Sequence, residues 1–211
     1  MNNLEDFLEY RLNLLAQAKD EHGFITEQKV LDEIMPSLLE AKLVDSSEPN
    51  DAYYCNTEKK HKLNAYAVNE SGERLQLFIV DEDSISENLQ TKEISISQKK
   101  HYENQINRAE KFIRYILAGN ESEIQESDPV RPLVSKLISE EGFEQFDTLD
   151  IFLISLTGTI STAGGNIQPR NMHFSEKSIT ATIHLAGKNK VKKDFLVMPH
   201  LIDLNRLYDV Q

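Results

Sequence analysis

Two amide side chains, Asn64 and Gln76, stand where the sequence would otherwise favour metal chemistry. The stretch 61–83, HKLNAYAVNESGERLQLFIVDED, predicts two strands joined by a short turn, with both amides facing inward. A nuclease that uses a divalent cation to activate water needs carboxylates on two adjacent strands. Amides offer neutral oxygens that cannot balance a divalent charge. The pair therefore predicts either a degenerate metal site or two ordinary polar residues near a strand end.

An acidic group follows the second of these strands and offers an alternative site. Asp81, Glu82 and Asp83 are consecutive, and Glu33 or Glu40 of a predicted helix could join them. Glu40, Asp81 and Asp83 would then hold Mg²⁺ as a displaced site. A solvated strand end explains the same charges equally simply. Without that displaced site, we expect no metal and no other cofactor.

Lysines are concentrated in two predicted turns, and both are candidates for binding nucleic acid. The first turn holds Lys59, Lys60 and Lys62, and the second holds Lys188, Lys190, Lys192 and Lys193. If both turns lie on one face, they would present a surface to phosphate groups. Lysine-rich turns also keep strand ends soluble. The net charge of -12 argues against a broad phosphate-binding surface but not against a local patch.

Length and composition limit the class of protein. A chain of 211 residues, 39% hydrophobic and 27% charged, is typical of a globular domain, and we expect residues 1–211 to form a single one. The lone cysteine, Cys55, excludes an internal disulfide and a two-cysteine zinc site. No 18-residue apolar run and no signal-peptide pattern occur, so we expect a soluble, cytoplasmic protein without a membrane partner.

The elements that must position these side chains follow from periodicity and from turn residues. Helical spacing predicts a helix up to about residue 18, another from Thr26 to about residue 43, and a long one over 97–117. Asp128 and Pro129 predict the start of a short helix that ends near residue 139. The predicted strands cover 52–56, 62–68, 74–80, 150–157, 178–185 and 194–198, with an exposed, mobile loop at 158–170 and a short helix or turn at 200–210.

This order of elements predicts an α+β fold with α/β-like character, in which a mixed central sheet is flanked by helices. The strand 74–80 is almost wholly apolar, so both of its faces must be covered.

Several blocks of the chain resemble the N-terminal region of abortive-infection phage-resistance (AIPR) proteins. The blocks are the early helices, DAYYCN, KLNAYAVNESGERLQLFIVDED, FIRYIL, DIFLISLTG and DLNRLYDV, which together cover nearly the whole chain. The resemblance implies a restriction-endonuclease-like fold of the PD-(D/E)xK kind. The family's metal-binding aspartate would fall at Asn64, its second acidic residue at Gln76 and its lysine at Phe78. All three depart from the motif.

The resemblance thus implies a nuclease-like domain of an anti-phage protein that has lost catalysis and acts in recognition or assembly. Its expected partners are nucleic acid, a phage or host protein, or a C-terminal domain of a longer parent protein. Two alternatives stay open. One is an active Mg²⁺-dependent nuclease that uses Glu40, Asp81 and Asp83, and the other is a pure protein–protein module whose 158–170 loop orders on its partner.

Overall fold

A six-stranded mixed sheet in the order β1-β2-β3-β4-β8-β7 forms the centre of the computed structural model. The structure describes residues 4–86, 95–158, 160–163, 166–169, 172–184 and 190–211. The helices are α1 (Leu4–Gln17), α2 (Glu27–Glu40), α3 (Lys99–Tyr115), α4 (Arg131–Ile138), α5 (Glu140–Gln145) and α6 (Leu204–Val210). The strands are β1 (Asn50–Asn56), β2 (His61–Val68), β3 (Arg74–Val80), β4 (Thr148–Ile154), β5 (Ile160–Ala163), β6 (Asn166–Pro169), β7 (Lys177–His184) and β8 (Lys190–Ile202).

The sheet combines an antiparallel meander with parallel strands. β1, β2 and β3 pair antiparallel, β3 pairs parallel with β4, and β4 pairs parallel with β8. β7 closes the far edge antiparallel to β8. Every residue of β3 from Leu75 to Val80 is buried, which confirms that this strand is covered on both faces. The α+β class with a mixed, helix-flanked sheet is confirmed as well.

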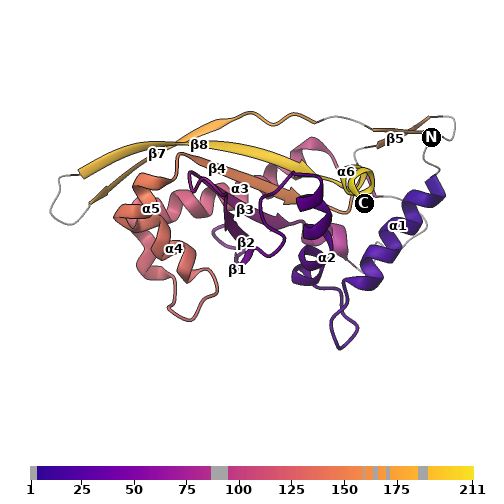
Figure 1. The fold of residues 1–211 in the computed structure, drawn as a ribbon, viewed down its shortest axis with the longest axis horizontal. Coiled ribbons are helices and arrows are strands. Elements are labelled where there is room, and N and C mark those ends of the chain that lie inside the picture. Colours follow the sequence, from indigo (N-terminus) through magenta and orange to yellow (C-terminus); the bar gives the residue numbers. More distant parts are fainter. Residues whose placement is uncertain (1–3, 87–94, 159, 164–165, 170–171, 185–189) are drawn as a thin grey trace.

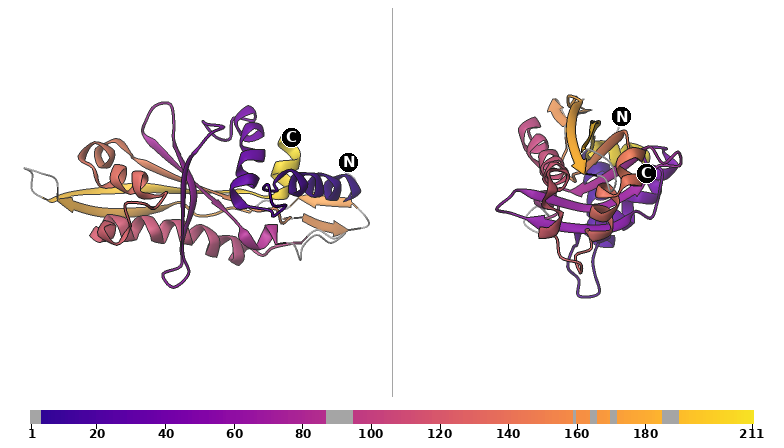
Figure 2. Two further views of the ribbon diagram at one scale, coloured as in Figure 1. Left: turned by 90° about the horizontal axis from the view of Figure 1, so that it is seen from below. Right: turned by 90° about the vertical axis from the view of Figure 1, so that its left-hand side faces the viewer.

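Helices cover both faces of the sheet and bury two separate apolar clusters. One cluster joins alternate side chains such as Leu75, Leu77 and Ile79 to α3, α4 and α5. The other joins Phe78 and Val80 to α1, α2 and α6. Figures 1 and 2 show an elongated molecule in which α1, α2 and α6 lie towards one end and α4 and α5 towards the other. No helix among the described residues is long and apolar enough to span a bilayer.

Local signals account for several helix ends. Thr26 caps α2 as predicted, because its hydroxyl oxygen accepts a hydrogen bond from the Lys29 backbone N–H at 3.2 Å. After α3 the chain continues into a π-helical turn over Ile116–Asn120, where Gly119 has φ 94°. Glycine adopts this left-handed conformation without strain, so the long helix ends where the sequence predicted.

The prediction for Asp128 is wrong. The helix begins at Arg131, and Asp128 instead organises the preceding turn: its carboxylate accepts from the Gln125 backbone N–H at 3.1 Å. Ser139 ends α4 and also caps α5, a short helix that periodicity did not predict.

The predicted loop 158–170 contains strands instead. β5 and β6 pair antiparallel within it, while residues 159, 164–165 and 170 lie outside the described part of the chain. β8 is also longer than predicted, because one end of it pairs with β4 and the rest with β7.

Candidate functional site

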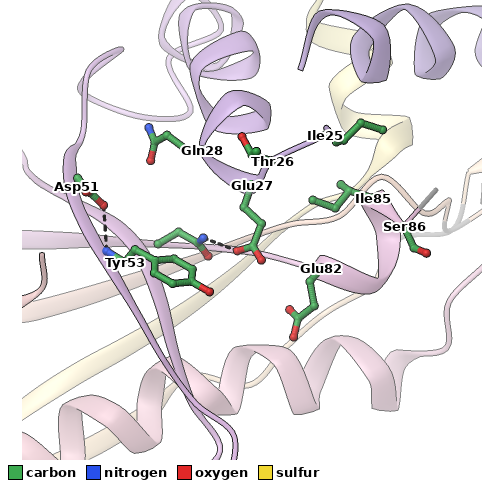
Figure 3. A pocket seen from close by; sticks show the side chains of 10 residues that line it. Ile25, Thr26, Glu27, Gln28, Asp51, Tyr53, Glu82, Ile85 and Ser86 are labelled. Carbon is green, nitrogen blue, oxygen red and sulfur yellow. Dashed lines mark hydrogen bonds between the residues drawn. The ribbon is translucent and has the colours of Figure 1, made fainter. Parts of the chain in front are cut away.

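A pocket of about 600 Å³ opens where β2 begins and β3 ends (Figure 3). Its walls come from the first turn of α2, from β1, from β2 and from the short 3₁₀ helix η1 (Glu82–Ile85) that follows β3. The lining residues are Ile25, Thr26, Glu27, Gln28, Asp51, Tyr53, Asn64, Glu82, Ile85 and Ser86.

Side chains replace backbone pairing at this end of the sheet. The regular pairing of β2 with β3 runs from Val68↔Leu75 to Ala65↔Phe78. Beyond it, the backbone N–H of Val80 donates to Asn64 Oδ1 at 2.8 Å, and the Val80 carbonyl accepts from Lys62 Nζ at 2.8 Å. The two strands therefore part here, and polar side chains of β2 satisfy the buried backbone groups of β3.

Lys62 is the most enclosed charged group of the site. Its side chain is 1% exposed, and its ammonium forms ion pairs with Glu82 and, at 2.9 Å, with Glu27. The Val80 carbonyl is the third acceptor. An ammonium carries three donors, so these acceptors use all of them.

The two carboxylates have further partners. Glu27 also accepts a hydrogen bond from the Asn64 amide, and Glu82 accepts one from Arg108 of α3 at 2.6 Å. Burial raises the pKa of Glu82, but the hydrogen bonds from Lys62 and Arg108 outweigh it, so the pKa lies below the ordinary carboxyl value. Glu82 is thus held as an anion, and two carboxylates face two cations.

These residues do not fit a divalent cation in this arrangement. A hard cation would need the oxygens of Glu27, Glu82, Asn64 and the Val80 carbonyl. The oxygens of Glu27, Glu82 and the Val80 carbonyl instead surround the Lys62 ammonium. Asn64 joins this group only through its Nδ2, which donates to Glu27. The amide oxygen is also used by the Val80 N–H.

The other two predicted positions of the degenerate motif are separated from Asn64. Gln76 is in register with Ala67, and it hydrogen-bonds Asp45 through Nε2 at 3.1 Å. Phe78 is fully buried and stacks on Phe152 with ring centroids 5.3 Å apart. In an antiparallel pair the start of one strand faces the end of the other, so Asn64 lies near the end of β3, where its amide oxygen accepts from the Val80 N–H.

The predicted displaced acidic site is brought together only in part. Glu40 ends α2, whereas Glu27 at the pocket begins it, which puts them about 20 Å apart at the rise of an α-helix. Asp81 and Asp83 do lie together, and their partner is His101 of α3.

The lysines predicted to bind nucleic acid fall into separate places. Lys59 and Lys60 are exposed in the β1–β2 turn, whereas Lys62 is buried in the site described above. Lys190, Lys192 and Lys193 belong to β8, and Lys188 lies outside the described residues. β1 and β2 lie at one edge of the sheet and β8 and β7 at the other, so Lys59 and Lys60 follow a strand of one edge, and Lys190, Lys192 and Lys193 belong to the opposite edge.

Sequence reasoning missed Glu27, Arg108 and the inward role of Lys62. Lys62 and Asn64 are two residues apart on one strand, which is the spacing of side chains that share a face. That spacing indicates that Lys62 faces inward with Asn64. The prediction instead placed Lys62 with the exposed lysines of the preceding turn. Arg108 gave no local signal, because it reaches Glu82 only through the packing of α3 on the sheet.

A family model described as the abortive infection phage resistance protein N-terminal domain matches residues 32–209 of this chain. The match confirms the resemblance drawn from the hydrophobic blocks, and it includes Lys62, Asn64 and Glu82 but not Glu27. No curated protein and no solved structure matches the chain in the other two comparisons.

Proposed function

Because this chain belongs to the family of abortive infection phage resistance protein N-terminal domains, we propose that it serves anti-phage defence as a nuclease-like domain without catalytic activity. The family description itself supplies the abortive-infection role. The proposal concerns the nuclease-like character, its loss of catalysis, and a remaining task in recognition or assembly.

The topology supports a nuclease-like ancestry. A helix, an antiparallel meander and a second helix follow each other as α2, β1–β2–β3 and α3, and after α4 and α5 comes β4, which is parallel to β3. Acidic side chains gather where β2 and β3 part, beside Asn64, the position that the PD-(D/E)xK resemblance implies for the first metal-binding aspartate.

The observation that carries the proposal is the position of the Lys62 ammonium. It pairs with both Glu27 and Glu82, so the internal cation already balances the charge that a metal would balance. A hydrolytic nuclease needs an activated water and a cation free to stabilise the charge that develops on phosphorus. Here Lys62 and Arg108 are both engaged by carboxylates.

Recognition of an anionic partner such as nucleic acid is supported by a neighbouring pocket of about 440 Å³. Glu82 lines both pockets. The second pocket is also lined by Asp83, by Arg108, which Glu82 engages, by Lys60 and Lys111, and by the polar side chains of Thr57 and Asn104. Positive charge beside hydrogen-bonding groups suits phosphate oxygens.

The test is incubation of the chain with DNA and with RNA in Mg²⁺ and in Mn²⁺, together with Glu27→Gln, Glu82→Gln and, as a control on the same helix, the exposed Glu33→Gln. We expect no cleavage by any of the four proteins, and retarded migration of the nucleic acid in a binding gel. Cleavage that Glu27→Gln and Glu82→Gln abolish and Glu33→Gln retains would overturn the proposal in favour of an active nuclease.

A further inference from the structure

A second group of titratable side chains lies next to the Lys62 site but is separate from it. Asp81 follows β3, Asp83 lies in η1, and His101 lies in the first turn of α3. One ligand atom from each falls within 4.8 Å of the others. We propose that these three residues bind a first-row transition-metal dication such as Zn²⁺ or Mn²⁺.

The structure holds Asp81 firmly in place. Its backbone N–H donates to the Ile154 carbonyl at 2.8 Å, which fixes the residue between β3 and β4. Its carboxylate is fully buried, and Oδ2 accepts a hydrogen bond from the Ser155 hydroxyl at 2.8 Å. His101 Nε2 lies 2.8 Å from the same oxygen. The Ser155 hydroxyl therefore holds this carboxylate in position, as hydrogen-bonding residues around the ligands do in metal sites.

The other oxygen of Asp81 lacks a partner, and this is the observation that indicates a bound cation. Oδ1 is buried and has no hydrogen-bond partner among the described residues. A buried carboxylate oxygen without a partner carries a substantial free-energy cost, and such groups are uncommon in folded proteins. A cation bound beside Asp81 would remove that cost.

The remaining geometry gives the ion access and open positions. Asp83 is exposed and the His101 side chain is 29% exposed, so the group is open to solvent on one side. Ligand atoms bound to one ion at about 2.0–2.2 Å lie roughly 3 Å or more from each other, so the present spacing needs only a small adjustment. The hydrogen bond between His101 and Asp81 would be replaced by shared coordination.

The ligand set decides the class of cation. Two carboxylates balance a charge of two and also suit Mn²⁺, and imidazole favours zinc and related transition metals over Mg²⁺ and Ca²⁺, which prefer oxygen ligands. His101 would have to be neutral, with its proton on Nδ1 and Nε2 free to coordinate. The inference does not depend on the proposed function, since it uses neither Lys62 nor Glu27.

The test is calorimetric titration of the full chain with ZnCl₂ and, separately, loss of the free Mn²⁺ signal in electron paramagnetic resonance. We expect one site per chain. His101→Gln and Asp83→Asn should each weaken binding at least about tenfold, since loss of even outer-shell partners has effects of that size. Both side chains keep solvent access, so these variants should fold, and circular dichroism checks that they do.

The control is His22→Gln, which removes an exposed histidine that lies beside Glu21 and does not belong to the group of Asp81, Asp83 and His101. It should bind Zn²⁺ like the unmodified chain, and a tenfold excess of MgCl₂ should not displace the ion. Absence of a saturable site in the unmodified chain would overturn the inference. Equal binding by folded His101→Gln and Asp83→Asn would overturn it too.

Discussion

Lys62 supplies the positive charge that the two carboxylates of the pocket, Glu27 and Glu82, share. It sits on β2 beside a turn of exposed lysines, yet its ammonium is enclosed by two carboxylates and a backbone carbonyl. A buried ammonium with three acceptors is satisfied in hydrogen bonding, and its removal takes one donor away from each of these acceptors. The residue therefore matters to folding as well as to the charge of the pocket.

Replacing Lys62 by methionine should destabilise the protein. Glu27 and Glu82 would face each other without their shared cation, and the Val80 carbonyl would lose its donor. We expect a loss of up to about 3 kcal/mol, at the low end for a broken buried pair because both carboxylates keep some contact with solvent. Urea unfolding measures it. The control, Lys100→Met, changes a lysine that is 75% exposed and should stay within about 0.5 kcal/mol; an equal effect of both variants would contradict the prediction.

Asn64 was singled out from the sequence and lines the pocket, whereas Gln76 and Phe78, which were grouped with it, lie elsewhere. Alternation along a strand tells which side chains share a face, and this brought Asn64 into consideration. The register between β2 and β3, which decides what lies opposite, depends on where the strands part. Gln76 and Phe78 were therefore grouped with Asn64, although the structure puts Gln76 against Asp45 and Phe78 against Phe152.

At the scale of elements, long periodic segments were predicted well and short ones poorly. α1, α2 and α3 each repeat their apolar spacing over several turns, and β2 and β3 end at turn residues. α5 is only one or two turns long, and β5 and β6 have four residues each, so they offer too few repeats to detect. The length of β8 depends on its two neighbours in the sheet, which no local pattern reveals.

Asp150 of β4 hydrogen-bonds side chains of both neighbouring strands, β3 and β8, so its replacement should lower the free energy of unfolding. This buried carboxylate of β4 binds Arg74 of β3 through two hydrogen bonds, at 2.6 and 2.8 Å, and His200 of β8 at 2.8 Å. Burial raises the pKa of Asp150. The hydrogen bonds from His200 and Arg74 lower it by more than burial raises it, so the pKa lies below the ordinary carboxyl value. We expect Asp150→Asn to cost about 3 kcal/mol at neutral pH, measured by urea unfolding.

The pH dependence gives the same prediction a second readout. A carboxyl whose pKa is lowered by folding stabilises the protein fully above its unfolded pKa, and this contribution is lost as the pH falls through the lowered value. The difference between Asp150→Asn and the unmodified chain should therefore shrink in acid. Asp147→Asn, at a carboxylate that is 71% exposed, should show little difference at any pH. A constant gap for Asp150→Asn down to the acid limit would refute the assigned role of its charge.

For the whole molecule, the central sheet supports both apolar clusters, and we expect them to unfold as one cooperative unit. Neighbouring residues of β3 serve opposite faces: Leu77 packs towards α3, and Phe78 packs towards α2. Helices on either face therefore share the same strands as their support. That sharing is the physical basis for expecting residues 1–211 to behave as a single domain.

Leu77→Ala and Phe78→Ala test this coupling from the two sides. Each should cost about 3–4 kcal/mol, the usual range for large cavities in a core, and each should lower one common unfolding transition. Hydrogen exchange followed separately in α2 and α3 measures it, and the exposed Phe24→Ala is the control, since that side chain is 61% exposed. If Phe78→Ala speeds exchange in α2 while α3 keeps its protection, the faces unfold independently. Equal acceleration in both helices is the expected result, because neither face can lose β3 without exposing the other.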